Sequence, residues 1–176
     1  MMESFMDKPK VAVVLGSDSD YPVIADMIKI LKDFEIEYEL VISSAHRSPT
    51  RTHQYAKKLE SRGIEAVIAC AGAAAHLAGV LASETILPVI GVPIDSSPLK
   101  GIDALLSTSM MPAGVPVATM GIGKSGASNA AVLTAQILAL KDKALAEKLR
   151  EYKKRLVRGV EKKDAELQKT LCSLKG

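Results

Sequence analysis

Short apolar runs alternate with helical patterns between residues 10 and 140, and this alternation limits the folds that the chain can adopt. Strands separated by helices need crossover connections, which make the strands parallel and place helices on both faces of the sheet. We therefore predict a single-domain three-layer α/β/α sandwich around a parallel five-stranded sheet. The predicted strands are Lys10–Leu15, Glu37–Ile42, Ala66–Cys70, Val89–Ile94 and Val117–Met120.

The residues at the expected helix ends agree with this alternation. Pro22 and Pro49 suit the first turns of two helices, and Gly63 suits the end of the second. We predict helices over residues 22–34, 49–63, 76–85, 102–109 and 127–140, with residues 121–126 as a flexible turn.

Beyond residue 141 the pattern changes to one long helix with a narrow apolar stripe. Leu145, Leu149, Tyr152, Leu156 and Val160 recur at spacings of three and four. This part has 12 Lys and Arg against 6 Asp and Glu, which leaves 11 against 14 for the remainder. We predict one domain over residues 1–176, with a core at about 10–140 and a helical extension at about 142–174. The stripe needs a cover, which another subunit can provide.

Composition excludes several functional classes. Only 3% of the residues are aromatic and Trp is absent, so platforms for stacking nucleic-acid bases are scarce and no nucleic-acid partner is expected. No apolar run approaches the ~20 residues that cross a membrane, and residues 1–10 lack the pattern of a signal peptide. Cys70 and Cys172 are isolated and lack metal-ligand spacing. We expect a cytoplasmic protein without a membrane partner.

The segment Ser43–Pro49 follows the second predicted strand and carries the strongest functional signal. It places His46 beside Arg47 where a helix begins, and ligands collect at the carboxyl ends of parallel strands. An imidazole can move a proton there while a guanidinium holds an anion. The alternative is a histidine that caps a helix beside a solvated arginine.

The segment Gly16–Asp20 follows the first predicted strand. Backbone N–H groups and Ser hydroxyls such as that of Ser17 suit a phosphate, and Asp20 suits sugar hydroxyls. Taken alone the pattern is weak, because a Ser/Asp helix cap has the same composition.

Two further loops contain small residues. In Ala71–Gly79, small side chains let backbone amides approach a ligand such as a carboxylate, although tight packing explains them equally well. Gly121–Gly126 matches G-x-G-x-x-G, but it lies in the last strand–helix unit, so we discount a dinucleotide site. His53 lies inside a helix and is expected at the surface or in packing.

Four motifs in order resemble one family. They are Gly-Ser-Asp-Ser-Asp at 16–20, Ser-Ala-His-Arg-Ser-Pro at 44–49, Ala-Gly-Ala-Ala-Ala-His-Leu-Ala-Gly at 71–79 and Met-Pro-Ala-Gly-Val-Pro-Val-Ala-Thr at 111–119. Together they resemble the PurE family of de novo purine biosynthesis, in particular its class I N5-carboxyaminoimidazole ribonucleotide mutases.

The resemblance implies a flavodoxin-like sheet and a homo-octamer without cofactor or metal. It implies an isomerase that moves a carboxylate from the exocyclic nitrogen of an aminoimidazole ribonucleotide to ring carbon 4. By this match His46 is the general acid/base, and Ser17, Asp20 and Arg47 hold the phosphoribosyl group. We also expect Ser44, Gly72, Ala74 and His76 to bind substrate, with the small residues forming the carboxylate and CO2 pocket.

The chain departs from the family pattern in its second loop, where Ala73 replaces a usual glycine and Ala78 a usual proline. If Ala73 occupies a position with positive φ, it costs on the order of 1 kcal/mol. A related branch carboxylates the aminoimidazole directly with CO2; Arg47 and His76 favour the mutase. A nucleotide-binding module without catalysis and an NAD-linked oxidoreductase built on residues 121–126 are the remaining alternatives.

Overall fold

The computed structural model describes residues 10–173. Residues 1–9 and 174–176 lie outside the described part. They include most of the segment that lacks a signal-peptide pattern and the last residue of the predicted extension, Leu174. By its internal contacts the chain forms two compact units, residues 1–137 and 138–176.

The first unit is built on a parallel five-stranded sheet in the order β2-β1-β3-β4-β5. This order is that of the flavodoxin-like fold, so the predicted fold class is confirmed. The strands are β1 Val11–Leu15, β2 Tyr38–Ile42, β3 Ala66–Gly72, β4 Val89–Ile94 and β5 Ala118–Thr119.

Strand β5 is shorter than the predicted Val117–Met120, and Pro93 in the neighbouring strand accounts for this. Ala118 and Thr119 are in register with Ile90 and Gly91 of β4, and the carbonyl of Gly91 accepts the N–H of Met120. The next residue of β4 that faces β5 is Pro93, which has no N–H to donate. The ladder therefore ends after two residues.

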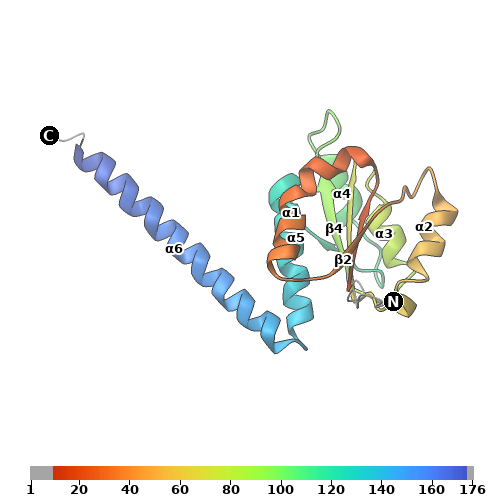
Figure 1. The fold of residues 1–176 in the computed structure, drawn as a ribbon. Coiled ribbons are helices and arrows are strands. Elements are labelled where there is room, and N and C mark those ends of the chain that lie inside the picture. Colours follow the sequence, from red (N-terminus) through yellow and green to blue (C-terminus); the bar gives the residue numbers. More distant parts are fainter. Residues whose placement is uncertain (1–9, 174–176) are drawn as a thin grey trace, which may run out of the picture. The chain divides into compact units, whose positions relative to one another are not determined.

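Helices cover both faces of the sheet (Figure 1). α1 (Tyr21–Asp33) and α5 (Gly123–Ala139) lie on one face, while α2 (Pro49–Ala56), α3 (Leu77–Ala82) and α4 (Ile102–Ser109) lie on the other. Two short 3₁₀ turns, Asp18–Asp20 and Glu60–Arg62, complete the unit. α2 ends earlier than predicted, at Ala56, and Gly63 closes the following turn at a φ of 86°.

The predicted flexible turn at residues 121–126 is wrong. α5 already begins at Gly123, and its first turn packs directly on the preceding backbone. A Cβ atom on Gly126 would lie 1.6 Å from the carbonyl oxygen of Gly121. The glycines of this G-x-G-x-x-G pattern therefore allow close packing of the helix start.

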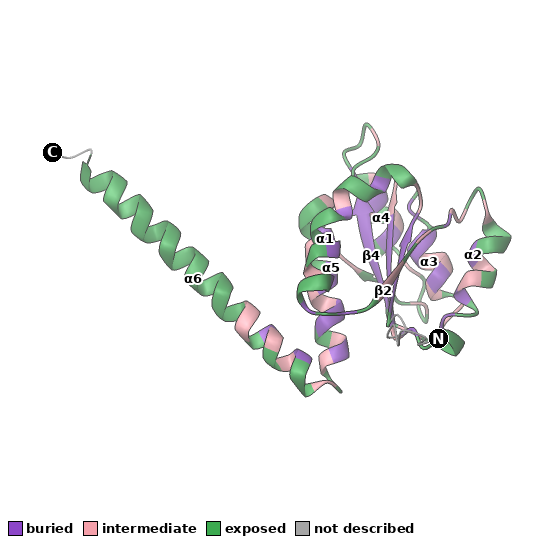
Figure 2. Ribbon diagram, in the orientation of Figure 1, coloured by how far each residue is buried: buried purple, intermediate pink, exposed green. Residues whose placement is uncertain are grey.

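The sheet forms the core of the first unit (Figure 2). All five residues of β1 are buried, as are the first five of β3 and all six of β4. The buried faces of α1 and α3 complete this core, which holds the strand ends in fixed positions.

The second unit contains α6, a helix of 31 residues over Lys143–Ser173, which confirms the predicted long helix. Leu145 and Leu149 are buried, but Leu156 and Val160 are 50% and 69% exposed. Within residues 10–173, no helix is both long and apolar enough to cross a membrane.

Candidate functional site

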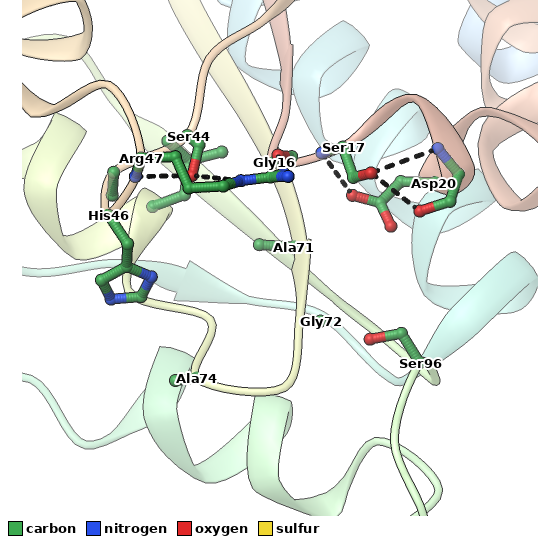
Figure 3. A pocket seen from close by; sticks show the side chains of 13 residues that line it. Gly16, Ser17, Asp20, Ser44, His46, Arg47, Ala71, Gly72, Ala74 and Ser96 are labelled. Carbon is green, nitrogen blue, oxygen red and sulfur yellow. Dashed lines mark hydrogen bonds between the residues drawn. The ribbon is translucent and has the colours of Figure 1, made fainter.

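A pocket of about 300 Å³ opens over the carboxyl ends of β1 to β4 (Figure 3). The loops after these strands line it, as expected for an open parallel sheet. Seven of the eight residues predicted from the sequence line the pocket: Ser17, Asp20, Ser44, His46, Arg47, Gly72 and Ala74. The eighth, His76, is hydrogen-bonded to His46.

The loop after β1 is held by a reciprocal cap. The Ser17 N–H donates to Oδ2 of Asp20 at 3.0 Å, and the Ser17 hydroxyl accepts the N–H of Ser19. Both interactions match the Ser/Asp cap considered from the sequence. The same residues also line the pocket, so the cap and the ligand-binding interpretations are compatible.

The loop after β2 is a turn tied to α2. The Ser44 carbonyl accepts from the Ser48 N–H, from the Ser48 hydroxyl and from the Thr52 hydroxyl. The Ser44 hydroxyl accepts the Arg47 N–H at 3.1 Å. These bonds fix the backbone that carries His46 and Arg47.

Arg47 joins this loop to the loop after β1. Its guanidinium donates from Nη2 to the carbonyl of Gly16 at 3.1 Å (Figure 3). The positive charge of Arg47 therefore lies beside Ser17. The other N–H donors of the guanidinium suit an anion. The two segments that the sequence placed at one edge of the sheet are thus in direct contact.

His46 and His76 form an imidazole pair. Nε2 of His46 and Nδ1 of His76 are 2.9 Å apart. The two rings pack edge to face in a T-shaped arrangement, with their centroids 5.0 Å apart. One ring must donate and the other accept, so the tautomers of the two residues are coupled. The pairing gives His46 a defined orientation at the pocket wall.

The end of β3 and the loop after it contain small residues that make room for neighbouring groups. A Cβ atom on Gly72 would lie 1.8 Å from the hydroxyl oxygen of Ser96. Glycine at this position therefore allows Ser96, which follows β4, to approach the pocket. The next residue, Ala73, has a φ of +51°, so the condition for the strain predicted from the sequence is met.

Burial changes the acid–base properties of two groups near the pocket. The pKa of Asp20 is raised above 3.8, mainly because burial penalises the carboxylate, although the Ser17 N–H and the Arg47 charge oppose this shift. Burial also raises the pKa of the Cys70 thiol. Cys70 is fully buried and has the character of a core residue rather than a nucleophile.

Other motifs lie outside the pocket. Nδ1 of His53 lies 3.0 Å from Oε1 of Glu84 at the surface, as expected for a helix-face histidine. None of the residues 121–126 lines the pocket. Among the described residues, no three His, Cys, Asp or Glu side chains are grouped to hold a metal ion.

The sequence interpretation missed Ser96. The signal was present, because Ser96 and Ser97 follow β4 just as other polar residues follow β1 and β2. What could not be read from the sequence is that Ser96 occupies the space beside Gly72.

The fold and the site define a class of flavodoxin-like α/β proteins with a pocket over the strand ends, here walled by a guanidinium and an imidazole group. A sequence model of the AIR carboxylase family matches residues 10–158, and the chain belongs to that family.

Relatives of the chain have closely similar sequences. The chain is 54% identical over 150 residues to the N5-carboxyaminoimidazole ribonucleotide mutase of Pyrococcus abyssi, covering 85% of each chain. It is 51% identical over 160 residues to that of Thermotoga maritima, covering 91% of this chain and 92% of the relative. The crystal structure of Treponema denticola PurE matches with a TM-score of 0.81 at 29% identity, covering 90% of this chain and 98% of that one.

Proposed function

We propose that this chain is an N5-carboxyaminoimidazole ribonucleotide mutase of purine biosynthesis, an isomerase that moves a carboxylate within its substrate. Relatives with this name share about half of their residues with this chain over most of their length. The observation that carries the proposal is the bond from Arg47 to Gly16, because it joins an anion-binding loop to the loop of His46.

The anionic end of the substrate fits the loop after β1. The Ser17 and Ser19 hydroxyls and the Arg47 guanidinium offer donors to a phosphate, and Asp20 offers acceptors to ribose hydroxyls. Burial raises the pKa of the Asp20 carboxyl, which favours its neutral form and so weakens its repulsion of a phosphate. Ser44 holds the Arg47 backbone in this arrangement.

The reacting end fits the opposite part of the pocket. Gly72 and Ala74 leave room for a planar carboxylate or CO2, and His46 lies beside them. His76 pairs with His46 and orients its ring toward the ligand.

His46 acts as both acid and base in this proposal. Its imidazolium gives a proton to the exocyclic nitrogen while the bond from nitrogen to the carboxylate breaks, releasing an amine and CO2. Ring carbon 4 then attacks CO2, and the neutral imidazole removes the proton from that carbon. One proton is given and one is taken back, so the reaction consumes no other reactant.

The pocket contributes mainly by confinement. CO2 must stay near carbon 4 until the new bond forms, and holding two reactants at attack distance supplies several kcal/mol, up to ~7–11 in well-oriented cases. As the family resemblance implies, the reaction uses neither metal nor cofactor and the enzyme is a homo-octamer. We further propose that it acts in the cytoplasm and has one domain per chain.

A direct assay tests the proposal. The chain is incubated with N5-carboxyaminoimidazole ribonucleotide without ATP, and the 4-carboxylated product is followed by its absorbance and by mass spectrometry. A parallel reaction supplies aminoimidazole ribonucleotide with bicarbonate at physiological concentration. Turnover in the first reaction supports the mutase, turnover only in the second supports a direct carboxylase, and binding without turnover supports a module without catalysis.

A further inference from the structure

The Ser17 hydroxyl in the loop after β1 makes all of its hydrogen bonds within that loop. It donates its single hydrogen to Oδ1 of Asp18 at 3.1 Å, and it accepts from both the hydroxyl and the N–H of Ser19. A serine hydroxyl has one hydrogen and two lone pairs, so these three bonds use its full capacity. The Ser17 N–H is also engaged, because it donates to Asp20. Ser17 therefore has to exchange a bond within the loop before its hydroxyl can donate to a ligand.

Asp18 is the acceptor that such an exchange displaces. Its side chain is exposed and does not line the pocket; it lines a neighbouring groove together with Tyr21 and Arg51. Within residues 10–173, Asp18 forms no ion pair with a basic side chain, Arg51 included. The Asp18 carboxylate therefore acts on the ligand-binding loop as an uncompensated negative charge.

The charge of Asp18 opposes a phosphate at this position. A phosphate oxygen and the displaced carboxylate oxygen, each about 3 Å from the Ser17 oxygen, lie no more than about 6 Å apart. Like charges at such a distance repel each other even near the protein surface. The same charge already reaches the rest of the loop, because it adds to the effect of burial, the main cause, in raising the pKa of Asp20.

The attraction that this repulsion opposes comes from Arg47. Among the described residues that line the pocket, Arg47 alone has a guanidinium or ammonium group. Its guanidinium lies beside Ser17 and uses one of its five donors on the carbonyl of Gly16 (Figure 3). Two side chains of opposite charge, Arg47 and Asp18, thus act on the same position.

We propose that Asp18 weakens the binding of the substrate's phosphate, because it competes with the phosphate for the Ser17 hydroxyl and repels its charge. Asp18 acts through Ser17, so it is a positioning residue and not a catalytic one. The inference rests on the proposed function for the identity of the substrate, but the exchange of bonds applies to any phosphate monoester bound at this loop.

The expected kinetic effect follows from the place of the phosphate in the reaction. The proposed mutase moves a carboxylate and leaves the phosphoribosyl group unchanged. An interaction that is equal in the substrate and in the transition state changes KM without changing kcat. Asp18 should therefore raise KM and leave kcat nearly unaltered.

Two substitutions separate the charge of Asp18 from its hydrogen bond. Asp18→Asn removes the charge but keeps an oxygen that can accept the Ser17 hydroxyl, whereas Asp18→Ala removes both. We expect KM to fall about threefold to tenfold in Asp18→Asn and at least as far in Asp18→Ala, with kcat within about twofold of the wild type. Asp26→Asn, at an exposed position on α1, makes the same change in net charge and should leave KM unaltered. Thermal unfolding checks that each variant is folded at the assay temperature.

Two further measurements distinguish this role from a general effect on the structure of the loop. The advantage of Asp18→Asn should shrink as the salt concentration rises from about 0.05 to about 0.5 M, because salt screens exposed charges. The reaction product and its ribonucleoside, which lacks the phosphate, are then compared as competitive inhibitors. Asp18→Asn should tighten the binding of the product and leave that of the ribonucleoside unchanged.

Ribose 5-phosphate tests the inference without the reaction. Calorimetry measures its binding to the wild type, Asp18→Asn and Asp26→Asn, and loss of binding in Arg47→Ala assigns it to the pocket. Tighter binding to Asp18→Asn alone supports the inference even if the mutase assay shows no turnover. The inference is wrong if Asp18→Asn binds ribose 5-phosphate no better than the wild type, if none of the proteins binds it, or if the ribonucleoside gains as much affinity as the product.

Discussion

The Nε2 atom of His46 lies 2.9 Å from the Nδ1 atom of His76, although the two residues are 30 positions apart in the sequence. Each follows a different strand of the sheet, β2 and β3, so the fold alone brings them together. A proton on one ring decides the tautomer of the other, which makes the pair a natural unit for moving a proton.

Replacing His46 with Asn should remove turnover but keep nucleotide binding. Asn is similar in size and can hydrogen-bond to His76, but it cannot exchange a proton near neutral pH. We expect kcat to fall about 10²- to 10⁴-fold. Calorimetry should show substrate affinity within about threefold of the wild type, since a threefold change is under about 0.7 kcal/mol. Near-normal turnover would contradict the acid/base role.

In the proposed mechanism His76 orients His46 and does not hold the phosphate, so replacing His76 with Ala should affect kcat more than KM. The loss of one neutral hydrogen bond is worth about 1.4 kcal/mol, or about tenfold in rate. His76→Asn keeps a hydrogen-bonding side chain and should recover part of the loss. If His76→Ala and His76→Asn were equally impaired, or if KM changed instead of kcat, the positioning role would be wrong.

Gly72 and Ser96 should depend on each other energetically. In Gly72→Ala the new Cβ atom would lie 1.8 Å from the Ser96 hydroxyl and 2.8 Å from its Cβ atom. We expect Gly72→Ala to lower the free energy of unfolding by roughly 1–3 kcal/mol, as overpacking does.

The double variant Gly72→Ala with Ser96→Gly removes both clashing atoms and should regain most of that stability. Chemical denaturation of the two single variants and the double variant measures the coupling. Additive effects would show that the contact between these two residues does not limit stability. The carbonyl of Ile94, 3.0 Å from the new Cβ atom, explains why recovery should be incomplete.

The parts of the fold that follow from local periodicity could be predicted from the sequence. Continuous apolar runs identify β1, β3 and β4, which are buried on both faces, and the helix starts at Tyr21 and Pro49 follow from nearby prolines. The site loops could also be predicted, because parallel strands place the loops after them at one edge.

The sequence predictions that were wrong or incomplete concern features that depend on contacts between distant residues. β5 ends early because Pro93 of β4 lacks a donor, and the glycines at 121 and 126 pack on each other instead of forming a flexible turn. The proximity of Ser96 to Gly72 is equally a tertiary contact. No local pattern contains this information, since each case needs the partner segment in place.

Replacing Ala73 with Gly should stabilise the protein. Ala73 has a φ of +51°, which costs an L-residue roughly 1–2 kcal/mol, while a glycine costs about 0.5–1 kcal/mol in chain entropy. We expect a net gain of about 0.5–1 kcal/mol, or about 2–3 °C in Tm for a chain of this size. Ala74→Gly, at a neighbouring position without positive φ, is the control and should destabilise. A lower Tm for Ala73→Gly would mean that other contacts outweigh the strain.

The buried carboxyl of Asp20 should make stability depend on pH in a defined direction. Its pKa in the folded protein is raised above 3.8, so between these two pKa values the folded state binds more protons than the unfolded state. Stability from this group is therefore fully present below pH 3.8 and is lost as pH rises through the folded pKa. Asp20→Asn has no such titration, although its amide oxygen can still accept the Ser17 N–H.

The free energy of unfolding of Asp20→Asn should therefore improve relative to the wild type as pH rises from about 4 to 7. Denaturant titrations of both proteins at several pH values across that range measure the difference. Asp26→Asn, at an exposed position on α1, is the control and should show no such trend. If the difference between Asp20→Asn and the wild type moved in the opposite direction, the Ser17 N–H and the Arg47 charge would outweigh the burial of Asp20.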